Sequence, residues 1–303
     1  MLAWLLSFGC APSRSRPGGA MQGPTPGLTG DAQDLATTSV DNDLGLAGSS
    51  ADQTTQDLGP PSPWVLTWSD EFDGPAGPID GTKWNFDTGG GGWGNNELEY
   101  YTSRVDNVTL DGKGALEIIA RKESYLGSSY TSGRINSAGK FTQAYGRFEA
   151  RIQIAQGQGI WPAFWTLGGN IGTAGWPQCG ELDIQETVNA TPKVNHGSAH
   201  GPGYSGGNPL TGTYTLPAGA LSDGYHLYAI EWEPNVVRWY VDDALYETRT
   251  PADVPAGDVW VYDHPFFVIL NLAVGGNFPG PPDGTTVFPA TTKVDYVRVY
   301  RKR

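Results

Sequence analysis

Three carboxylates within six residues are the clearest chemical feature of the sequence. They lie in residues 176–186 (WPQCGELDIQE), at Glu181, Asp183 and Glu186. Alternate side chains of a regular strand share a face, so Glu186 would lie on the face opposite to the other two. A β-bulge near Gln185 would return Glu186 to the face of Glu181, and bulges commonly re-aim side chains beside active sites. The run therefore predicts a bulged strand with three acidic side chains on one face.

This arrangement suits the hydrolysis of a glycosidic bond. With the bulge absorbed, the Cα atoms of Glu181 and Glu186 are about four strand residues, or roughly 13 Å, apart. Two glutamate side chains that lean toward each other can close much of that distance. Retaining glycosidases need their two carboxyl groups about 5–5.5 Å apart, so the spacing permits retention without proving it. Crowding with Asp183 should raise at least one pKa, as a general acid near neutral pH requires.

An acidic triple on a strand also suits a solvated face or a calcium cluster. The tryptophans around it favour a sugar site instead. Trp176 begins the acidic run, and Trp161 and Trp165 alternate with Phe164 in the earlier segment GIWPAFW. Indole rings on one face of a strand offer flat surfaces on which sugar rings stack.

Composition supports an all-β enzyme of neutral sugars. The chain has 303 residues with 43 glycines and 23 prolines, and it shows no long segment of helical apolar spacing, which favours a large β-sandwich. The net charge of -13, without clustered basic residues, argues against nucleic acid as a partner. It argues more weakly against sulfated polysaccharides.

Strand-like alternation supports the same fold. Residues 145–154 alternate between apolar and charged side chains, and residues 294–300 alternate similarly. Residues 236–241 and 244–248 flank Asp242 and Asp243, which predicts a hairpin with a tight turn.

The N-terminal part of the chain differs from the rest. Residues 1–10 (MLAWLLSFGC) resemble a signal-peptide remnant or a lipoprotein leader, which predicts a secreted protein, with lipid anchoring through Cys10 as the alternative to a plain export signal. Residues 11–63 have the composition of a disordered linker. We expect one folded domain over residues 64–303, with no transmembrane span. Cys179 is the single cysteine in that range, so we expect no disulfide within the domain.

From about Trp64 to Arg301 the chain resembles glycoside hydrolase family 16, especially its bacterial laminarinase-like (endo-β-1,3-glucanase) branch. The resemblance rests on the Glu-x-Asp-x-x-Glu strand and on six segments in the family's order: WSDEFDG, WGNNELEYYT, GKFTQAYGRFEARI, GQGIWPAFWTLG, NLAVGGNFPG and VDYVRVY. It implies a two-sheet antiparallel jelly roll of the concanavalin A-like type with a concave substrate cleft. The licheninase branch usually lacks the extra residue before the second glutamate, so the bulged form favours β-1,3-linked substrates.

The resemblance also implies roles for individual residues. Glu181 would be the nucleophile, Asp183 the assisting acid and Glu186 the acid/base, with His200 nearby. A histidine bonded structurally within a strand is the alternative for His200. The positions that match glucose-binding residues are Asn96, Arg134, Trp161, Trp165 and Trp176. Arg134 could instead only brace the carboxylates, and Asn96 could cap a turn.

No cofactor is expected for catalysis. Many relatives carry a structural calcium ion on the convex side, held by backbone oxygens near the first strand and by an aspartate of the last strand. The counterparts of its ligands here are Glu71, Gly114 and Asp295. A plain pair of edge carboxylates is the alternative. Oxygen ligands of this kind suit a hard cation.

The predicted function is retaining, endo-acting hydrolysis of β-1,3-glucosidic bonds in β-glucans such as laminarin, by a monomer. The alternatives are a mixed-linkage (1,3-1,4) β-glucanase, a transglycosylase, and a non-catalytic β-glucan-binding protein on the same fold. Non-catalytic relatives typically lose catalytic glutamates, whereas both are present here.

Overall fold

The computed structural model describes residues 63–188 and 191–303. The leader predicted at residues 1–10 and the linker predicted at residues 11–63 lie outside the described residues, except for Pro63. Within the described part, almost every regular element is a β-strand. The exceptions are the short helix α1 (Ile171–Ala174) and the 3₁₀ helix η1 (Pro251–Asp253). No helix in this part of the chain is both long and apolar enough to cross a membrane.

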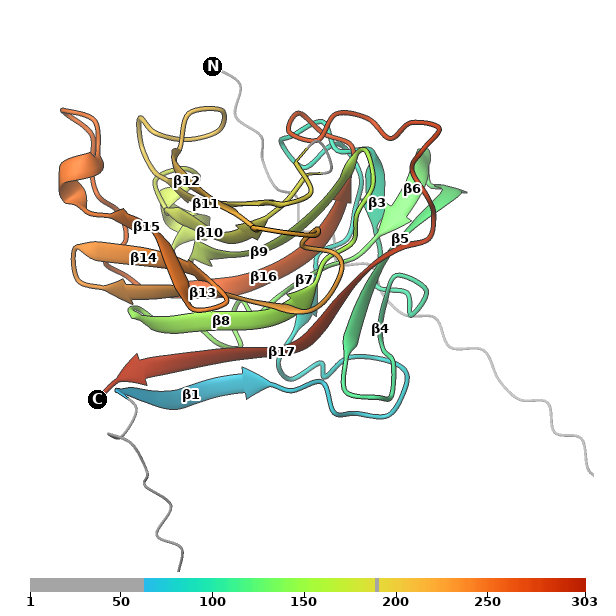
Figure 1. Cartoon of the computed structure of the whole chain (residues 1–303), viewed down its shortest axis with the longest axis horizontal. Helices are drawn as coiled ribbons and strands as arrows, with labels where there is room; N and C mark the ends of the chain where they lie inside the picture. Colours follow the sequence, from blue (N-terminus) through green and yellow to red (C-terminus); the bar gives the residue numbers. More distant parts are fainter. Residues whose placement is uncertain (1–62, 189–190) are drawn as a thin grey trace, which may run out of the picture. The chain divides into compact units, whose positions relative to one another are not determined.

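The strands form two sheets that pack face to face (Figure 1). The larger sheet has ten strands in the described residues: β15 (Ala244–Arg249), β14 (Val236–Val241), β13 (His226–Glu233), β8 (Gly146–Gln153), β17 (Ala290–Lys302), β5 (Leu116–Tyr125), β6 (Ser128–Ser132) and β3 (Glu99–Tyr101), with β1 (Trp64–Asp70) paired to β17 and β4 (Val108–Leu110) paired to β5. The smaller sheet has seven: β12 (Leu210–Thr215), β11 (Val194–His200), β10 (Glu181–Glu186), β9 (Ile160–Gly168), β16 (Phe266–Val274), β7 (Arg134–Asn136) and β2 (Asn85–Phe86). The predicted two-sheet sandwich is confirmed.

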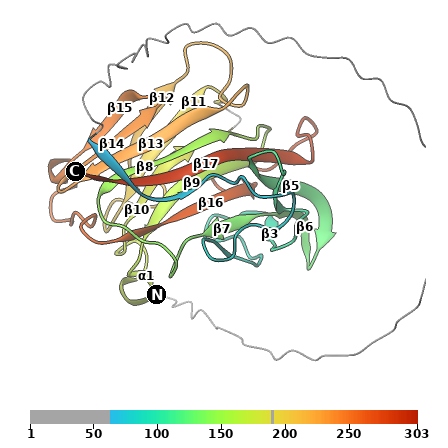
Figure 2. The same cartoon turned by 90° about the horizontal axis from the view of Figure 1, so that it is seen from below.

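The pairing is antiparallel throughout these strands except between β3 and β6, which run parallel. β1 and β17 come from opposite ends of the folded region and lie side by side (Figure 2). The predicted hairpin is formed by β14 and β15, and Asp242 and Asp243 both have positive φ, as a type I′ turn requires.

The core lies between the two sheets. Each sheet contributes alternate apolar side chains, among them Phe148 and Trp232 from the larger sheet and Phe164 and Leu182 from the smaller one. Residues 145–154 were predicted to form a half-buried strand. β8 buries Phe148 and its alternate neighbours as expected, but Arg147 and Glu149 on its charged face are buried as well and pair with each other. The second face of the seven-stranded sheet is turned away from this core, and we call it the outer face.

Candidate active site

β10 contains the bulge that the spacing of its carboxylates predicts. Its register against β9 shifts between Asp183 and Gln185, and its register against β11 shifts between Asp183 and Glu186. The three acidic residues pair with alternate residues of β9: Glu181 with Leu167, Asp183 with Trp165, and Glu186 with Ala163. Directly paired residues of a sheet project to the same side, and alternate residues of β9 share a face. All three carboxylates therefore lie on the outer face.

The intervening apolar residues confirm this orientation. Leu182 and Ile184 are fully buried and belong to the core between the sheets. A strand without a bulge would have placed Glu186 among them.

Two tryptophans donate hydrogen bonds to the two glutamates. The Trp176 Nε1–H donates to Glu181 Oε2 at 3.0 Å, and the Trp161 Nε1–H donates to Glu186 Oε1 at 3.0 Å. The sequence predicted these indoles as sugar-stacking surfaces, and the structure adds a bond that orients each carboxylate. The Trp176 side chain is 45% exposed, so its ring face is accessible.

His200 lies on the neighbouring strand β11, directly opposite Glu181. Its Nδ1 accepts a hydrogen bond from the Gly206 backbone N–H at 3.2 Å, so the ring proton of the neutral imidazole must reside on Nε2. That nitrogen lies 2.9 Å from Asp183 Oδ2 and 3.8 Å from Glu181 Oε1. Asp183 Oδ2 receives no well-aligned hydrogen bond from this nitrogen.

Each of the three carboxyl groups has a raised pKa, so the cluster carries fewer than three negative charges near neutral pH. Burial raises the pKa of Glu181 to about 7, and the charge of Asp183 adds to this rise. Burial also raises the pKa of Asp183. Burial, followed by the charge of Asp183, also places the pKa of Glu186 well above its ordinary value. His200, the hydrogen bond from Trp176 and the Arg134 guanidinium, in that order, act in the opposite direction on the pKa of Glu181, which favours Glu181 as the carboxylate that ionises first.

Arg134, on β7, is held between two indoles. Its guanidinium carbon lies 4.7 Å from the ring centroid of Trp93 and 4.8 Å from that of Trp165, and its Nε pairs with Asp87 Oδ2 at 3.0 Å. These contacts fix the Trp165 ring beside the carboxylates. Asn96 adopts a positive φ and donates from Nδ2 to Asn277 Oδ1 at 2.8 Å, so it links two loops.

A chain of buried polar groups supports Trp165 and was not recognised from the sequence. The Trp165 Nε1–H donates to Asn271 Oδ1 at 2.7 Å, and Asn271 Nδ2 donates to the Tyr101 hydroxyl at 3.2 Å. The Tyr101 hydroxyl donates to Glu97 Oε2 at 2.9 Å. Asn271 is the one polar residue in the otherwise apolar strand FFVILNLAV, a signal that could have drawn attention to it.

The residues chosen as calcium ligands are engaged by arginines. Glu71 accepts three hydrogen bonds from Arg298, and Asp295 pairs with Arg151 at 2.8 Å. Guanidinium groups already neutralise these two carboxylates. The predicted calcium site draws mainly on backbone oxygens, which these ion pairs do not engage, so it stays a prediction. Gly114 adopts a positive φ, and a Cβ built on it would lie 3.4 Å from Asp73 Oδ1. In the described residues, the ligand atoms of Glu181, Asp183 and His200 lie within 4.8 Å of one another, close enough to hold a metal ion.

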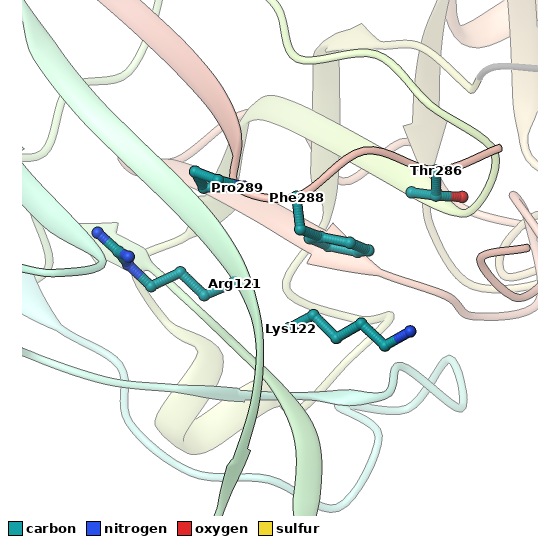
Figure 3. A pocket seen from close by; sticks show the side chains of 5 residues that line it. All are labelled: Arg121, Lys122, Thr286, Phe288 and Pro289. Carbon is teal, nitrogen blue, oxygen red and sulfur yellow. The ribbon is translucent and has the colours of Figure 1, made fainter. Parts of the chain in front are cut away.

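A separate hollow of about 330 Å³ lies outside the acidic cluster (Figure 3). The residues that line it are Arg121, Lys122, Thr286, Phe288 and Pro289. None of them is a carboxylic acid or a histidine, so this hollow lacks the pair of carboxyl groups that glycoside hydrolysis needs. The outer face around β10 is therefore the candidate active site.

Comparison with known proteins agrees with this geometry. The profile of the glycosyl hydrolases family 16 matches residues 94–298. A beta-glucanase of Rhodothermus marinus is 46% identical over 249 residues, which cover 78% of this chain and 85% of that protein. An endo-1,3-1,4-beta-glycanase of Rhizobium meliloti is 33% identical over 258 residues, which cover 77% of this chain and 51% of that protein. The solved laminarinase catalytic domain from Thermotoga maritima is 47% identical with a TM-score of 0.75, and the match covers 79% of this chain and 99% of that domain.

Proposed function

The chain belongs to glycosyl hydrolase family 16, and from that membership we propose that it is a retaining endo-1,3-β-glucanase acting on β-glucans such as laminarin. The observation that carries the proposal is the bulge in β10. It sets Glu181 and Glu186 on one face of the sheet, with Asp183 between them. Each glutamate is oriented by an indole N–H.

The proposed reaction has two displacements. In the first, the ionised Glu181 attacks the anomeric carbon while the protonated Glu186 transfers its proton to the departing glycosidic oxygen. The carbon–oxygen bond breaks, and the sugar becomes an ester of Glu181. In the second, Glu186, now ionised, takes a proton from water as the water oxygen attacks the anomeric carbon and releases Glu181. The two inversions together retain the anomeric configuration.

Asp183 and His200 serve this proton movement. Asp183 raises the pKa of both glutamates, which keeps a proton available to Glu186. His200 presents Nε2 to Asp183 and Glu181. Family 16 glycosidases need no catalytic cofactor, and no step here uses one. A structural calcium ion stays a prediction, because backbone oxygens would supply most of its ligands and Arg151 already pairs with the Asp295 carboxylate.

The aromatic surfaces around the carboxylates support a neutral glucan as substrate. Trp161, Trp165 and Trp176 lie beside the acidic residues, and Arg134 and Asn96 complete the proposed sugar-binding set. The laminarinase relative favours β-1,3 linkages. Tolerance of mixed 1,3-1,4 linkages is the second candidate, favoured by the Rhizobium relative. We further propose a secreted monomer, anchored through Cys10 if that residue is lipidated.

Two alanine variants test the proposal. Glu181→Ala and Glu186→Ala should each reduce the release of reducing ends from laminarin by at least about 10²-fold. Glu233→Ala, which removes a carboxylate from β13, is the control and should retain activity. Near wild-type release by both active-site variants would overturn the proposal.

Product profiles of the wild-type protein on laminarin, lichenan, curdlan and agarose would separate the linkage alternatives. If none of these polysaccharides gave a product, a non-catalytic binding protein would be favoured.

A further inference from the structure

The bulge in β10 leaves backbone carbonyl groups without their regular partners in the sheet. A bulge interrupts the ladder, and a buried carbonyl that loses its ladder bond needs another donor. Two side chains supply donors at this point. The Trp239 Nε1–H donates to the Asp183 carbonyl at 2.8 Å, and Asn195 Nδ2 donates to the Ile184 carbonyl at 3.1 Å.

These donors come from other strands and reach the bulge through the core. Trp239 lies on β14 in the opposite sheet, and Asn195 lies on β11 beside β10; both side chains are fully buried. Asn195 Nδ2 also donates to the Tyr246 hydroxyl at 3.1 Å. A Cβ on Gly197 would lie 2.4 Å from that hydroxyl and 2.5 Å from the Trp239 ring. Glycine at this position makes room for both side chains.

The burial of the Asn195 side chain carries an unfavourable free energy that packing alone does not explain. Its Oδ1 is buried without a hydrogen-bond partner, and an unsatisfied buried acceptor is unfavourable. An apolar side chain would avoid this cost. The amide is useful here because it bonds the carbonyl of Ile184, the residue that the register against β9 skips.

We propose that Asn195 and Trp239 are positioning residues for the acid/base, because their hydrogen bonds hold the bulge that keeps Glu186 on the outer face with Glu181. Neither residue contacts the sugar. The inference rests on the proposed function, since it requires Glu186 to protonate the leaving group. Loss of either bond would let β10 approach regular pairing, which would turn Glu186 toward the core.

A pair of substrates separates this role from general destabilisation. Laminarin has a poor leaving group that needs a proton from Glu186, whereas a dinitrophenyl β-laminaribioside has a leaving group that departs without one. Trp239→Phe and Asn195→Leu should lower kcat on laminarin by at least about 10-fold, with a smaller change in KM. On the aryl glycoside, kcat/KM should change by less than about 3-fold. Azide, which needs no general base, should accelerate turnover of the aryl glycoside by both variants.

Trp232→Phe is the matched control. Trp232 is also fully buried in the larger sheet, and its Nε1–H donates to the Tyr262 carbonyl at 3.0 Å rather than to a carbonyl of the bulge. This variant removes the same kind of bond, so it should show no selective loss on laminarin. Trp239→Phe keeps an aromatic ring in the core, so it tests the inference even if Asn195→Leu fails to fold.

The outcomes are distinct. Equal losses on both substrates, or behaviour of Trp239→Phe that matches Trp232→Phe, would overturn the positioning role. If Glu186→Ala shows the selective loss on laminarin and the two positioning variants do not, this inference fails while the proposed function survives. If Glu186→Ala itself shows no selectivity, the acid/base assignment fails.

Discussion

Replacing Glu181 with glutamine should stabilise the protein at alkaline pH. Glutamine is nearly isosteric and keeps an oxygen that can accept the Trp176 indole hydrogen bond, but it cannot ionise. The folded environment raises the pKa of Glu181 from 4.5 to about 7, mainly by burial. The folded protein therefore retains a proton that the unfolded chain has released, and stability is lost as the pH rises through this interval.

The size of the effect follows from the two pKa values. The gap between 4.5 and about 7 corresponds to about 3 kcal/mol. At about pH 4 the group is protonated in the folded state and mostly protonated in the unfolded state, so the wild-type protein and Glu181→Gln should have similar free energies of unfolding. By about pH 9 the variant should be more stable by about 2–3 kcal/mol.

Urea unfolding followed by tryptophan fluorescence at several pH values measures this difference. Glu233→Gln provides a control of opposite sign, because hydrogen bonding to Lys302 and Arg238 lowers the pKa of Glu233. That variant should lose stability relative to the wild type as the pH rises. If Glu181→Gln and the wild type show the same dependence of unfolding free energy on pH, the burial of an ionisable Glu181 is refuted.

Two further predictions follow from the site. Asp183→Asn removes a charge that raises the pKa of both Glu181 and Glu186. Both limbs of the pH profile of kcat/KM on laminarin should therefore move to lower pH. A pH profile that stays in place would contradict the electrostatic role of Asp183. Asn271→Leu leaves the partly buried Trp165 indole N–H without its acceptor, so KM for laminarin should rise about 5–10-fold with little change in kcat. A loss confined to kcat would show that Trp165 does not act in substrate binding.

The bulge was predictable because the sequence contains both of its local signals. Leu182 and Ile184 must face the core, and the position of Glu186 conflicts with that alternation unless one residue is absorbed. The strands β8, β14 and β15 were likewise predicted from alternation and turn residues. The last strand proved longer than predicted, running from Ala290 to Lys302, because its partner changes from β5 to β1 along its length.

Contacts between distant segments were not predictable in the same way. Trp165 bonds Asn271, 106 residues away, and Asn271 bonds Tyr101 across 170 residues. No local pattern encodes such pairs. The same holds for Trp239, whose donor reaches β10 from the opposite sheet. The arginines that occupy Glu71 and Asp295 were also missed, since an ion pair and a cation site draw on the same acidic residues.

The most direct test of the account is to identify the residue that bears the covalent intermediate. An activated 2-deoxy-2-fluoro β-laminaribioside slows both displacements, so the glycosyl-enzyme ester should accumulate when the protein is incubated with it. Mass spectrometry of the digested protein should then find one added laminaribiosyl group on the peptide that contains residues 181–186, attached to Glu181. An adduct on Glu186 or on another residue, or turnover of the natural substrate with inversion of the anomeric centre, would contradict the proposed pairing of the two glutamates.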